Sequence, residues 1–422
     1  MITSHLRCFN PACGSEQPRS TTSYACPDCQ GLLELTYDFP SLQAPDWPRL
    51  WQQRLGPGPG REGSGVWRFR EMLPLFDDGA GMVSLGEGNT PLIAAPRAAQ
   101  WAGVRALSIK HQGANPTGSF KDLGMTVCIT EALRLGVGVV ACASTGNTSS
   151  SMAAYAARAG IKSLVFVPQG AVSGAKLAQA IDFGAQVVET GANFDQAFRL
   201  LRQMSDQLGL YLVNSINPFR LEGQKAVVLQ ILEQRGWQPP DYIVLPGGNL
   251  GNVSAVGKAL AELAALNLIS RMPRLVVVQA QGASPFHQMW RSQSARISPV
   301  SEPATRATAI RIGNPANWPK AARALAQTEG ITEAVTDQEI RAAKAELAQG
   351  GIGCEPASAA TLAGVRKLRE AGEIEPGADV VAILTGHQLK DPDYITEQLG
   401  RGGMLQVEPT PAAILGALRD WN

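Results

Sequence analysis

One lysine of the chain stands where its amine can do covalent chemistry. Lys121 lies near the end of the polar, turn-forming segment 115–122 (NPTGSFKD), which leads directly into a helix-like run at 124–133. A lysine held by packed backbone, rather than on a mobile surface, is placed to lose its proton and form a Schiff base with a carbonyl group. The segments that surround this amine therefore determine which carbonyl compound can bind beside it.

A second segment predicts a site for one phosphate. Residues 242–254 (YIVLPGGNLGNVS) have the pattern of a strand, a glycine-rich turn and a helix, whose free N–H groups and dipole attract a dianion. Gly247, Gly248 and Gly251 let the main chain approach that anion, although glycines in such a turn can also serve packing alone. No acidic residue follows at the spacing of a dinucleotide fingerprint. An imine-forming lysine together with a cup for one phosphate is what pyridoxal phosphate requires.

Two further strand ends carry polar groups that suit such a cofactor and its substrate. Segment 144–152 (STGNTSSSM) offers hydroxyls and N–H donors for a carboxylate, and Asn147 can bond a phenolic oxygen. Helix capping alone would also favour these residues, but a cap needs only one of them. Thr385 follows the last apolar strand as a neutral partner for a pyridine nitrogen, which we expect to leave that nitrogen largely unprotonated. We interpret the neighbouring His387 as a structural hydrogen-bond partner.

The cysteines divide into two groups. Two short pairs near the N-terminus, at Cys8, Cys13, Cys26 and Cys29, are spaced to place four thiolates around a structural zinc ion. The alternative is four free or redox-active thiols, and we expect the module to serve only the stability of the N-terminus. The remaining three thiols have small or apolar neighbours and are predicted to be buried, namely Cys128, Cys142 and Cys354.

The order of the elements predicts an α/β fold. Apolar strands alternate with alanine-rich helices, which implies parallel sheets covered on both faces, with ligands at the strand ends. A strand is also expected at 32–37, and the segment 45–92, rich in Trp, Pro and Gly, is predicted to be an arm with little regular structure. The main predicted strands lie at 137–143, 163–167, 186–189, 242–245, 275–279 and 380–384.

Composition limits the partners. The 422 residues are 45% hydrophobic, and 37 Lys plus Arg against 36 Asp plus Glu give a formal net charge of +1. This balance provides no basic field for nucleic acid or an anionic membrane, so we expect small molecules or other subunits as partners. No stretch approaches the ~20 apolar residues of a membrane span and no signal peptide is visible at the N-terminus, so we expect a cytoplasmic protein.

Several ordered blocks give the chain a resemblance to the threonine synthases, in the fold-type II group of pyridoxal-phosphate enzymes. The resemblance extends along nearly the whole chain, and some blocks distinguish it from the related dehydratases and cysteine synthases. The blocks are 31–38 (GLLELTYD), 84–92 (SLGEGNTPL), 115–122, 143–148 (ASTGNT), 214–225 (NSINPFRLEGQK), 309–315 (AIRIGNP), 354–359 (CEPASA), 384–387 (LTGH) and 389–392 (LKDP).

The resemblance implies an architecture of two three-layer αβα domains, similar to the tryptophan synthase β fold, and a small zinc ribbon. The expected limits are 1–40 for the ribbon, 41–127 with 207–400 for a large cofactor-binding domain, 128–206 for a small domain and 401–422 for a tail. It also implies a homodimer and the conversion of O-phospho-L-homoserine and water to L-threonine and phosphate.

The resemblance further implies a role for individual residues. Lys121 would hold the cofactor covalently and move protons, Asn147 would bond its 3-hydroxyl and Thr385 would meet its ring nitrogen. Thr148 would bind the substrate carboxylate. The cofactor phosphate would lie on Gly248, Asn249, Leu250, Gly251 and Asn252, and the substrate phosphate on Lys176, Ser215 and Arg220. Two cations and a hydroxyl suit a dianion, although Lys176 can also be read as a solvated helix lysine.

Three positions depart from the family pattern and keep alternatives open. Leu123 stands where an arginine is common, Leu250 where alanine is usual, and Gln388 where glycine is usual. Leu123 removes a charge near the site, so a related enzyme that replaces phosphate with another nucleophile, such as cysteate synthase, is the main alternative. A threonine or serine dehydratase would not need Lys176 and Arg220. A non-catalytic nucleic-acid or scaffold protein is opposed by the neutral charge.

Overall fold

The computed structural model describes most of the chain, in two compact units that comprise residues 1–390 and 391–422. Side chains at 168, 174–176 and 398–399 lie outside this description. The described residues are 4–22, 24–39, 46–55, 63–73, 81–168, 174–191, 201, 203, 205, 207, 209–399 and 406–419.

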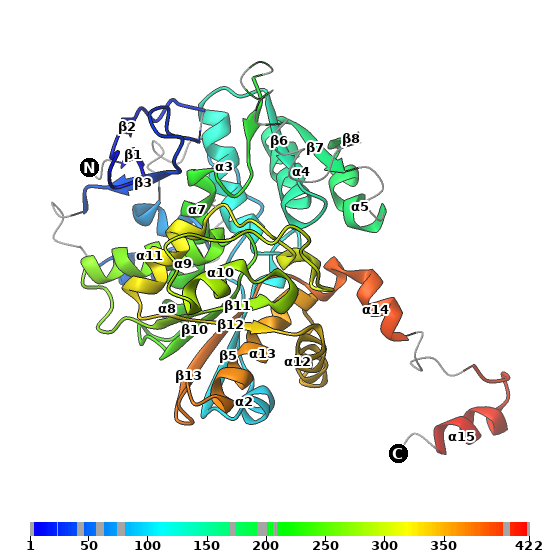
Figure 1. Ribbon diagram of the computed structural model, residues 1–422. Helices are drawn as coiled ribbons and strands as arrows, with labels where there is room; N and C mark the ends of the chain where they lie inside the picture. Colours follow the sequence, from blue (N-terminus) through cyan, green and yellow to red (C-terminus); the bar gives the residue numbers. More distant parts are fainter. Residues whose placement is uncertain are drawn as a thin grey trace. The chain divides into compact units, whose positions relative to one another are not determined.

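The largest sheet of the first unit has six strands in the order β12-β11-β10-β13-β5-β4. Figure 1 labels five of these strands, β5 and β10 to β13. All neighbouring strands are parallel except β4, which pairs antiparallel with β5 at one edge. The predicted strands at 242–245, 275–279 and 380–384 are confirmed. The bounds are β4 Leu92–Ala94, β5 Ala106–His111, β10 Tyr242–Pro246, β11 Arg274–Ala280, β12 Ile331–Val335 and β13 Asp379–Leu384.

Alternating side chains of this sheet enter two different cores. Ile243 and Leu245 pack with α8, α9, α10 and α11, whereas Tyr242 and Val244 pack with α2, α12 and α13. Successive residues of a strand point to opposite faces, so a fully apolar strand indicates a sheet covered on both sides. The covering helices are α2 Pro96–Ala102, α8 Ala226–Gln234, α9 Gly251–Ala265, α10 Pro285–Arg291, α11 Trp318–Gln327, α12 Asp337–Gln349 and α13 Pro356–Glu370.

A second, four-stranded parallel sheet has the order β8-β7-β6-β9. Its core contains residues of α3, α4 and α5, together with the thiols of Cys128 and Cys142, which are buried as predicted. Cys354 is buried in a core of the larger sheet. The bounds are α3 Lys121–Arg134, β6 Val139–Ala143, α4 Asn147–Ala159, β7 Lys162–Pro168, α5 Gly174–Asp182, β8 Gln186–Thr190, β9 Tyr211–Leu212 and α7 Pro218–Gln224.

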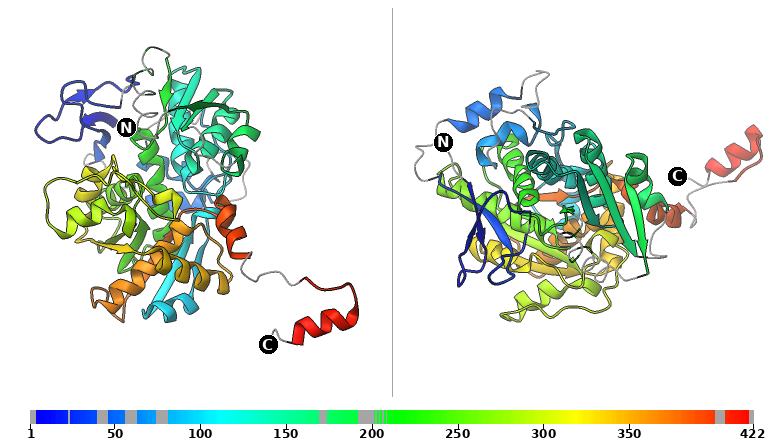
Figure 2. Two further views of the ribbon diagram at one scale, coloured as in Figure 1. Left: turned by 45° about the vertical axis from the view of Figure 1, so that its right-hand side comes forward. Right: turned by 90° about the horizontal axis from the view of Figure 1, so that it is seen from above.

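A small antiparallel sheet near the N-terminus has the order β2-β1-β3, formed by β1 Ser4–Cys8, β2 Glu16–Gln17 and β3 Leu33–Tyr37. Cys8 ends β1, and Cys13, Cys26 and Cys29 lie in the segments between the strands. The expected strand at 32–37 is confirmed. Figure 2 shows this sheet, in dark blue, beside the helices of the large sheet. Arg323 of α11 pairs with Glu34 at 2.6 Å, and Lys320 donates to the carbonyl of Leu33 at 2.7 Å.

The arm predicted at 45–92 has more structure than expected. Its described part contains the helix α1 Trp47–Gln53 and the 3₁₀ helix η3 Trp67–Met72, so that prediction was wrong for these residues. Trp51, Trp67 and Phe69 are fully buried in the same core as α8 and α9. Burial of such large rings outweighs the weak local preference of a segment rich in Pro and Gly.

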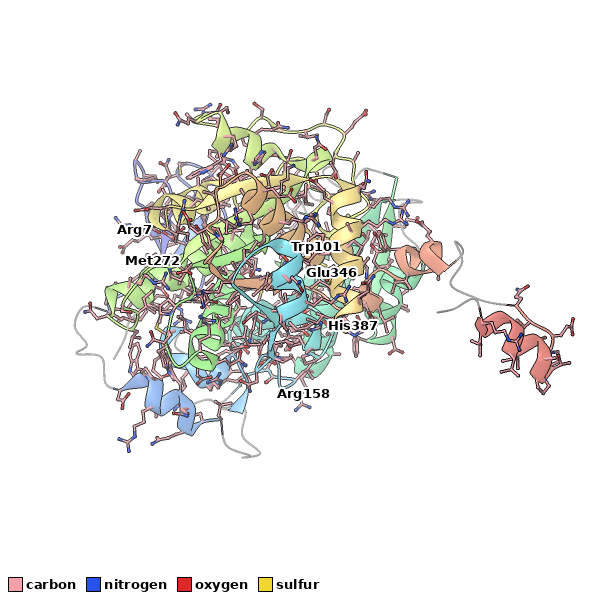
Figure 3. The ribbon with its side chains drawn as sticks, turned by 90° about the horizontal axis from the view of Figure 1, so that it is seen from below. Arg7, Trp101, Arg158, Met272, Glu346 and His387 are labelled. Atoms are coloured by element: carbon pink, nitrogen blue, oxygen red, sulfur yellow. The ribbon has the colours of Figure 1, made fainter. Side chains whose placement is uncertain are left out.

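The remaining elements are short. The pair α2 and α12 is held in part by the ion pair between Arg97 and Glu346 at 2.8 Å, and Figure 3 labels Glu346 near Trp101 of α2.

No helix in the described ranges is long and apolar enough to cross a membrane. The other bounds are η5 Gln112–Ala114, η6 Gln281–Ala283, η7 Thr308–Ile310 and η8 Gln388–Lys390 in the first unit, with α14 Pro392–Leu399 and α15 Pro411–Arg419 in the second.

Candidate active site

Two glycines bring Lys121 and Arg220 together. Gly124 of α3 and Gly223 of α7 lie where the helices touch: a Cβ on Gly124 would lie 2.5 Å from the carbonyl oxygen of Arg220, and one on Gly223 would lie 2.0 Å from that of Leu123. Because only glycine permits this approach, the helix that begins at Lys121 packs directly on the helix that carries Arg220. The side chain of Leu123 lies in the hydrophobic core.

The environment of the Lys121 amine favours its neutral form. The pKa of Lys121 is lowered to about 7, mainly by burial and also by the nearby Arg220 guanidinium, while Glu355 opposes both. The amine also lies 4.0 Å from the centre of the Phe120 ring. A lysine with a pKa near neutrality can act as a nucleophile and exchange protons.

The residue after this lysine fixes the turn in which it sits, a role that the sequence analysis missed. Asp122 is fully buried, and its carboxylate accepts hydrogen bonds from the amide of Thr117 at 2.7 Å, the hydroxyl of Thr117 at 2.6 Å and the hydroxyl of Ser151 at 2.6 Å. Burial raises the pKa of Asp122 to about 6. The turn before Lys121 is thereby tied to α4.

Arg220 is buried with its Nε donor unused. Its side chain is 1% exposed, Nη1 donates to the carbonyl of Val213 at 2.8 Å, and Nη2 donates to the hydroxyl of Thr148 at 3.1 Å. Among the described residues its Nε has no acceptor. Burial lowers the pKa of Arg220, but an arginine side chain stays charged in proteins, and a buried charge of this kind needs an anionic partner.

The glycine-rich turn lies between Ser215 and the segment 309–317. Asn249 donates to the hydroxyl of Ser215 and accepts from the amide of Ala316 at 2.6 Å. A Cβ on Gly248 would lie 3.0 Å from the carbonyl oxygen of Ala309. Leu250, which caps α9, has φ 62° and ψ 6°, a conformation that costs a bulky residue about 1 kcal/mol or more. Such strain is typical of turns held for a ligand.

Polar groups beside this turn also lack partners. Asn252 is buried at the start of α9, and its Nδ2 has no acceptor within the described part of the chain. Asn317 donates to the carbonyl oxygens of Ser215 at 3.1 Å and Asn249 at 3.3 Å, so it joins the two segments. The sequence analysis missed Asn317, since an asparagine ahead of a helix is usually a cap.

A third group of contacts links Asn147 and Thr385. The amide of Asn147 donates to Glu355 Oε2 at 3.0 Å, and the hydroxyl of Thr385 donates to Glu355 Oε1 at 3.2 Å. Ser358 lies 3.0 Å from Thr385, oxygen to oxygen. His387 accepts a hydrogen bond from the amide of Leu389, in agreement with its interpretation as a structural residue. The sequence analysis missed Glu355 and Ser358, which precede and begin a helix far along the chain.

These contacts connect most of the predicted site residues. Lys121 is electrostatically coupled to Arg220 and to Glu355, so the groups around Arg220 and around Glu355 belong to one site. The substrate contact predicted at Lys176 falls on a side chain outside the described residues, although its helix α5 is described.

The four N-terminal cysteines converge. Their Sγ atoms all lie within 4.8 Å of one another, with 3.4 Å between Cys8 and Cys29 and 3.7 Å between Cys13 and Cys26. Four thiolates bound to zinc at about 2.3 Å in a tetrahedron lie roughly 3.8 Å apart, so the arrangement fits this ion.

The cysteine module also contacts helices of the site. Tyr37 donates to Glu222 of α7 at 2.6 Å, and Arg19 pairs with Glu131 of α3 at 3.4 Å. Tyr24 packs edge-on against Tyr211, with 5.4 Å between ring centres. The module therefore rests on the two helices that carry Lys121 and Arg220.

The donor set fits pyridoxal phosphate. The cofactor needs a nucleophilic amine, donors for a phosphate and polar partners for a pyridine ring. Lys121 has the lowered pKa, the turn at 248–252 has a buried unpartnered donor in Asn252, and Asn147 and Thr385 lie on one carboxylate. The unpartnered Nε of Arg220 fits a further anion.

Comparisons with known proteins agree with this chemistry. Residues 83–386 match the family described as "Pyridoxal-phosphate dependent enzyme". The chain is 46% identical to the threonine synthase of Methanocaldococcus jannaschii over 92% of this chain and 93% of that protein. It is 45% identical to the threonine synthase of Methanosarcina acetivorans, over 93% and 94%.

The fold has counterparts among solved structures. The processed form of threonine deaminase isoform 2 from Solanum lycopersicum superposes with a TM-score of 0.62 at 20% identity, over 75% of this chain and 89% of that chain. This likeness concerns the fold alone. The sequence identity to the curated relatives, spread over nearly their whole length, shows that the chain belongs to the threonine synthase family of pyridoxal-phosphate-dependent enzymes.

Proposed function

We propose that this protein is a threonine synthase that converts O-phospho-L-homoserine and water to L-threonine and phosphate. The observation that carries the proposal, beside the family membership, is the buried Arg220 with an unused donor next to a lysine of lowered pKa. A substrate with a phosphate at one end and an α-carbon at the other suits this pair. The reaction is balanced: the C–O bond to phosphate breaks, and water supplies the new hydroxyl.

The residues divide the work of binding and proton transfer. Pyridoxal phosphate, held by Lys121 until the amine of the substrate takes the place of the lysine, would supply the sink for the electrons left at the substrate carbon atoms. The Lys121 amine takes a proton from Cα and later one from Cβ. Since one amine accepts one proton at a time, the first must leave before the second is removed, which a pKa of about 7 permits.

We assign the binding contacts on the same basis. Arg220, Ser215 and Lys176 hold the phosphate of the substrate, and Thr148 holds its carboxylate. The support for Arg220 and Thr148 is their hydrogen bond, and the support for Ser215 is its contact with Asn249. The turn from Gly248 through Asn249, Leu250 and Gly251 to Asn252 holds the cofactor phosphate, while Asn147 and Thr385 bond its ring.

The departure at Leu123 does not argue for another substrate. Its side chain is 1% exposed and packs in the hydrophobic core, so it offers the site neither a charge nor a polar group. The alternatives of a cysteate synthase-like enzyme or a dehydratase are therefore not favoured, and family membership with this site opposes a non-catalytic scaffold protein.

The proposal is tested with purified protein loaded with pyridoxal phosphate. We expect equal amounts of phosphate and L-threonine from O-phospho-L-homoserine, no sulfite-dependent product from O-phosphoserine, and no oxo acid from threonine or serine. Lys121→Ala should bind the cofactor without the absorbance of a covalent link and turn over no substrate, whereas Lys162→Ala, an exposed lysine, should behave as the wild type. Normal turnover by Lys121→Ala would refute the assignment.

We further propose that Cys8, Cys13, Cys26 and Cys29 hold one structural zinc ion, supported by the sulfur distances. A closed Cys₄ site leaves no coordination position for substrate, so this ion takes no part in the reaction.

The family resemblance also supports a cytoplasmic homodimer, divided into a ribbon at 1–40, a large domain at 41–127 and 207–400, a small domain at 128–206 and a tail at 401–422. Light scattering of the purified protein tests the dimer, and a mass that corresponds to one chain would exclude it.

A further inference from the structure

Glu355 holds the two side chains that we assign to the cofactor ring. It is 4% exposed and accepts from Asn147 through one carboxylate oxygen and from Thr385 through the other. Its carboxyl group also fills the space beside Gly386, where a Cβ would lie 2.5 Å from it. The carboxylate therefore packs between the side chains that it orients, and this packing restricts its rotation.

The hydrogen bonds that Ser358 accepts determine which hydroxyl donates in the contact between Ser358 and Thr385. Its oxygen accepts from the amide of Thr385 at 2.8 Å and from the amide of Gly386 at 3.1 Å. A hydroxyl oxygen has two lone pairs, and both are used. The proton of Ser358 is therefore free to donate, and the hydroxyl oxygen of Thr385 lies 3.0 Å away.

The hydroxyl proton of Thr385 and one of its lone pairs are consequently in use as well. It accepts from Ser358 with one lone pair and donates its only proton to Glu355, which leaves one lone pair and no proton. A ring nitrogen that meets this oxygen can form a hydrogen bond only if the nitrogen itself carries the proton.

We propose that Glu355 is a positioning residue that, through Thr385, holds the ring nitrogen of the bound cofactor in its protonated form. The inference rests on the proposed function, since that function places Thr385 at the ring nitrogen. It reverses the expectation from sequence that Thr385, as a neutral hydroxyl partner, leaves the ring nitrogen largely unprotonated.

This direction of the hydrogen bonds requires an ionised Glu355. A protonated Glu355 would donate, and the chain of bonds would run the other way. The pKa of Glu355 is raised, mainly by burial, against the lowering effect of its hydrogen bonds from Asn147 and Thr385 and of the charges of Lys121 and Lys390. An ionised carboxylate accepts from both neighbours, as the geometry requires.

A protonated ring nitrogen suits the demands of the proposed reaction. Two protons leave one substrate skeleton in succession, and a pyridinium withdraws electrons more strongly than a neutral pyridine. An aspartate in direct contact achieves this in other enzymes. Here the same effect would pass from a buried glutamate through a hydroxyl.

The test is the protonation state of the ring nitrogen itself. Wild-type protein, loaded with pyridoxal phosphate labelled with ¹⁵N in the ring, should give the nitrogen signal of a pyridinium in solid-state NMR. Glu355→Gln should shift it toward a neutral pyridine, because the new amide can donate to Thr385 and release that proton toward the ring. Glu346→Gln, on the outer helix α12, is the matched control and should leave the signal unchanged.

Each outcome decides the proposal. A neutral nitrogen in the wild type, or a pyridinium retained in Glu355→Gln, would overturn it. If Glu355→Gln does not fold or load, Thr385→Val replaces it: loss of the acceptor should also give a neutral nitrogen, and a retained pyridinium would count against the inference. Threonine formation with a neutral nitrogen would overturn only this inference, whereas failure to take up the cofactor would overturn the proposed function.

Discussion

Removing the charge of Lys121 should stabilise the cofactor-free protein. Burial disfavours the charged ammonium form of Lys121 in the folded state, so the pKa of Lys121 falls from 10.5 to about 7. At about 1.4 kcal/mol per pKa unit, this difference corresponds to roughly 5 kcal/mol against the folded state at low pH. Because part of the residue remains accessible to solvent, we reduce the expected effect to about 2 kcal/mol.

The sign of the pH dependence follows from proton binding. The unfolded chain holds the lysine proton up to about pH 10.4, whereas the folded chain releases it near pH 7. Stability rises with pH wherever the unfolded state binds more protons. The penalty is therefore complete below pH 7 and disappears as the pH rises toward 10.5.

The assay compares the wild type with Lys121→Met, both freed of cofactor, by thermal unfolding between pH 6.5 and 9.5. Met has a similar length and no charge, so we expect the variant to unfold roughly 2–4 °C higher at pH 6.5, with a smaller difference at pH 9.5. The exposed Lys162→Met is the control and should show no such trend. A variant no more stable than the wild type, or a difference that does not change with pH, would refute the reasoning.

Three further outcomes follow from the site and its supports. Arg220→Gln removes the buried cation and should lower kcat/KM for O-phospho-L-homoserine about tenfold to a hundredfold, measured by phosphate release, because a hydrogen bond to a charged group contributes about 1.5–3 kcal/mol; an unchanged kcat/KM would exclude it from phosphate binding. Gly223→Ala should destabilise the fold by about 1–3 kcal/mol in denaturant unfolding, since its Cβ would meet a carbonyl oxygen at 2.0 Å. Gly138→Ala, with no atom within 4 Å, is its control, and equal stability of the two variants would contradict the close helix contact. Zinc analysis should find about one ion per chain, lost in Cys26→Ser and kept in Cys354→Ser; retention in both would remove the Cys₄ assignment.

Local patterns were sufficient to predict the strands β6, β7, β8, β10, β11 and β13 and the glycine-rich turn after β10. The apolar runs at 242–245 and 380–384 form strands because neighbouring residues face two separate cores, and their lack of polar alternation already indicates this. The glycine-rich turn after the first of them leads into α9 as expected. Such features depend on residues close together in the chain, so the sequence displays them directly.

The arm before Leu92 was harder to predict. Trp51 and Trp67 lie in a segment whose Pro and Gly content favours irregular structure, yet both rings are buried in the core. Their burial depends on helices more than a hundred residues away, about which the local composition carries no information.

The sequence by itself determined which residues we assign to the chemistry: Lys121, the turn that ends at Asn252, and four cysteines spaced for one ion. Only the tertiary structure decided how these groups are held. The contact of Gly124 with Arg220, and the carboxylate of Glu355 between Asn147 and Thr385, join segments far apart in the chain. Hydrogen-bond direction and pKa depend on which partners packing brings within about 3 Å, and no local pattern specifies those partners.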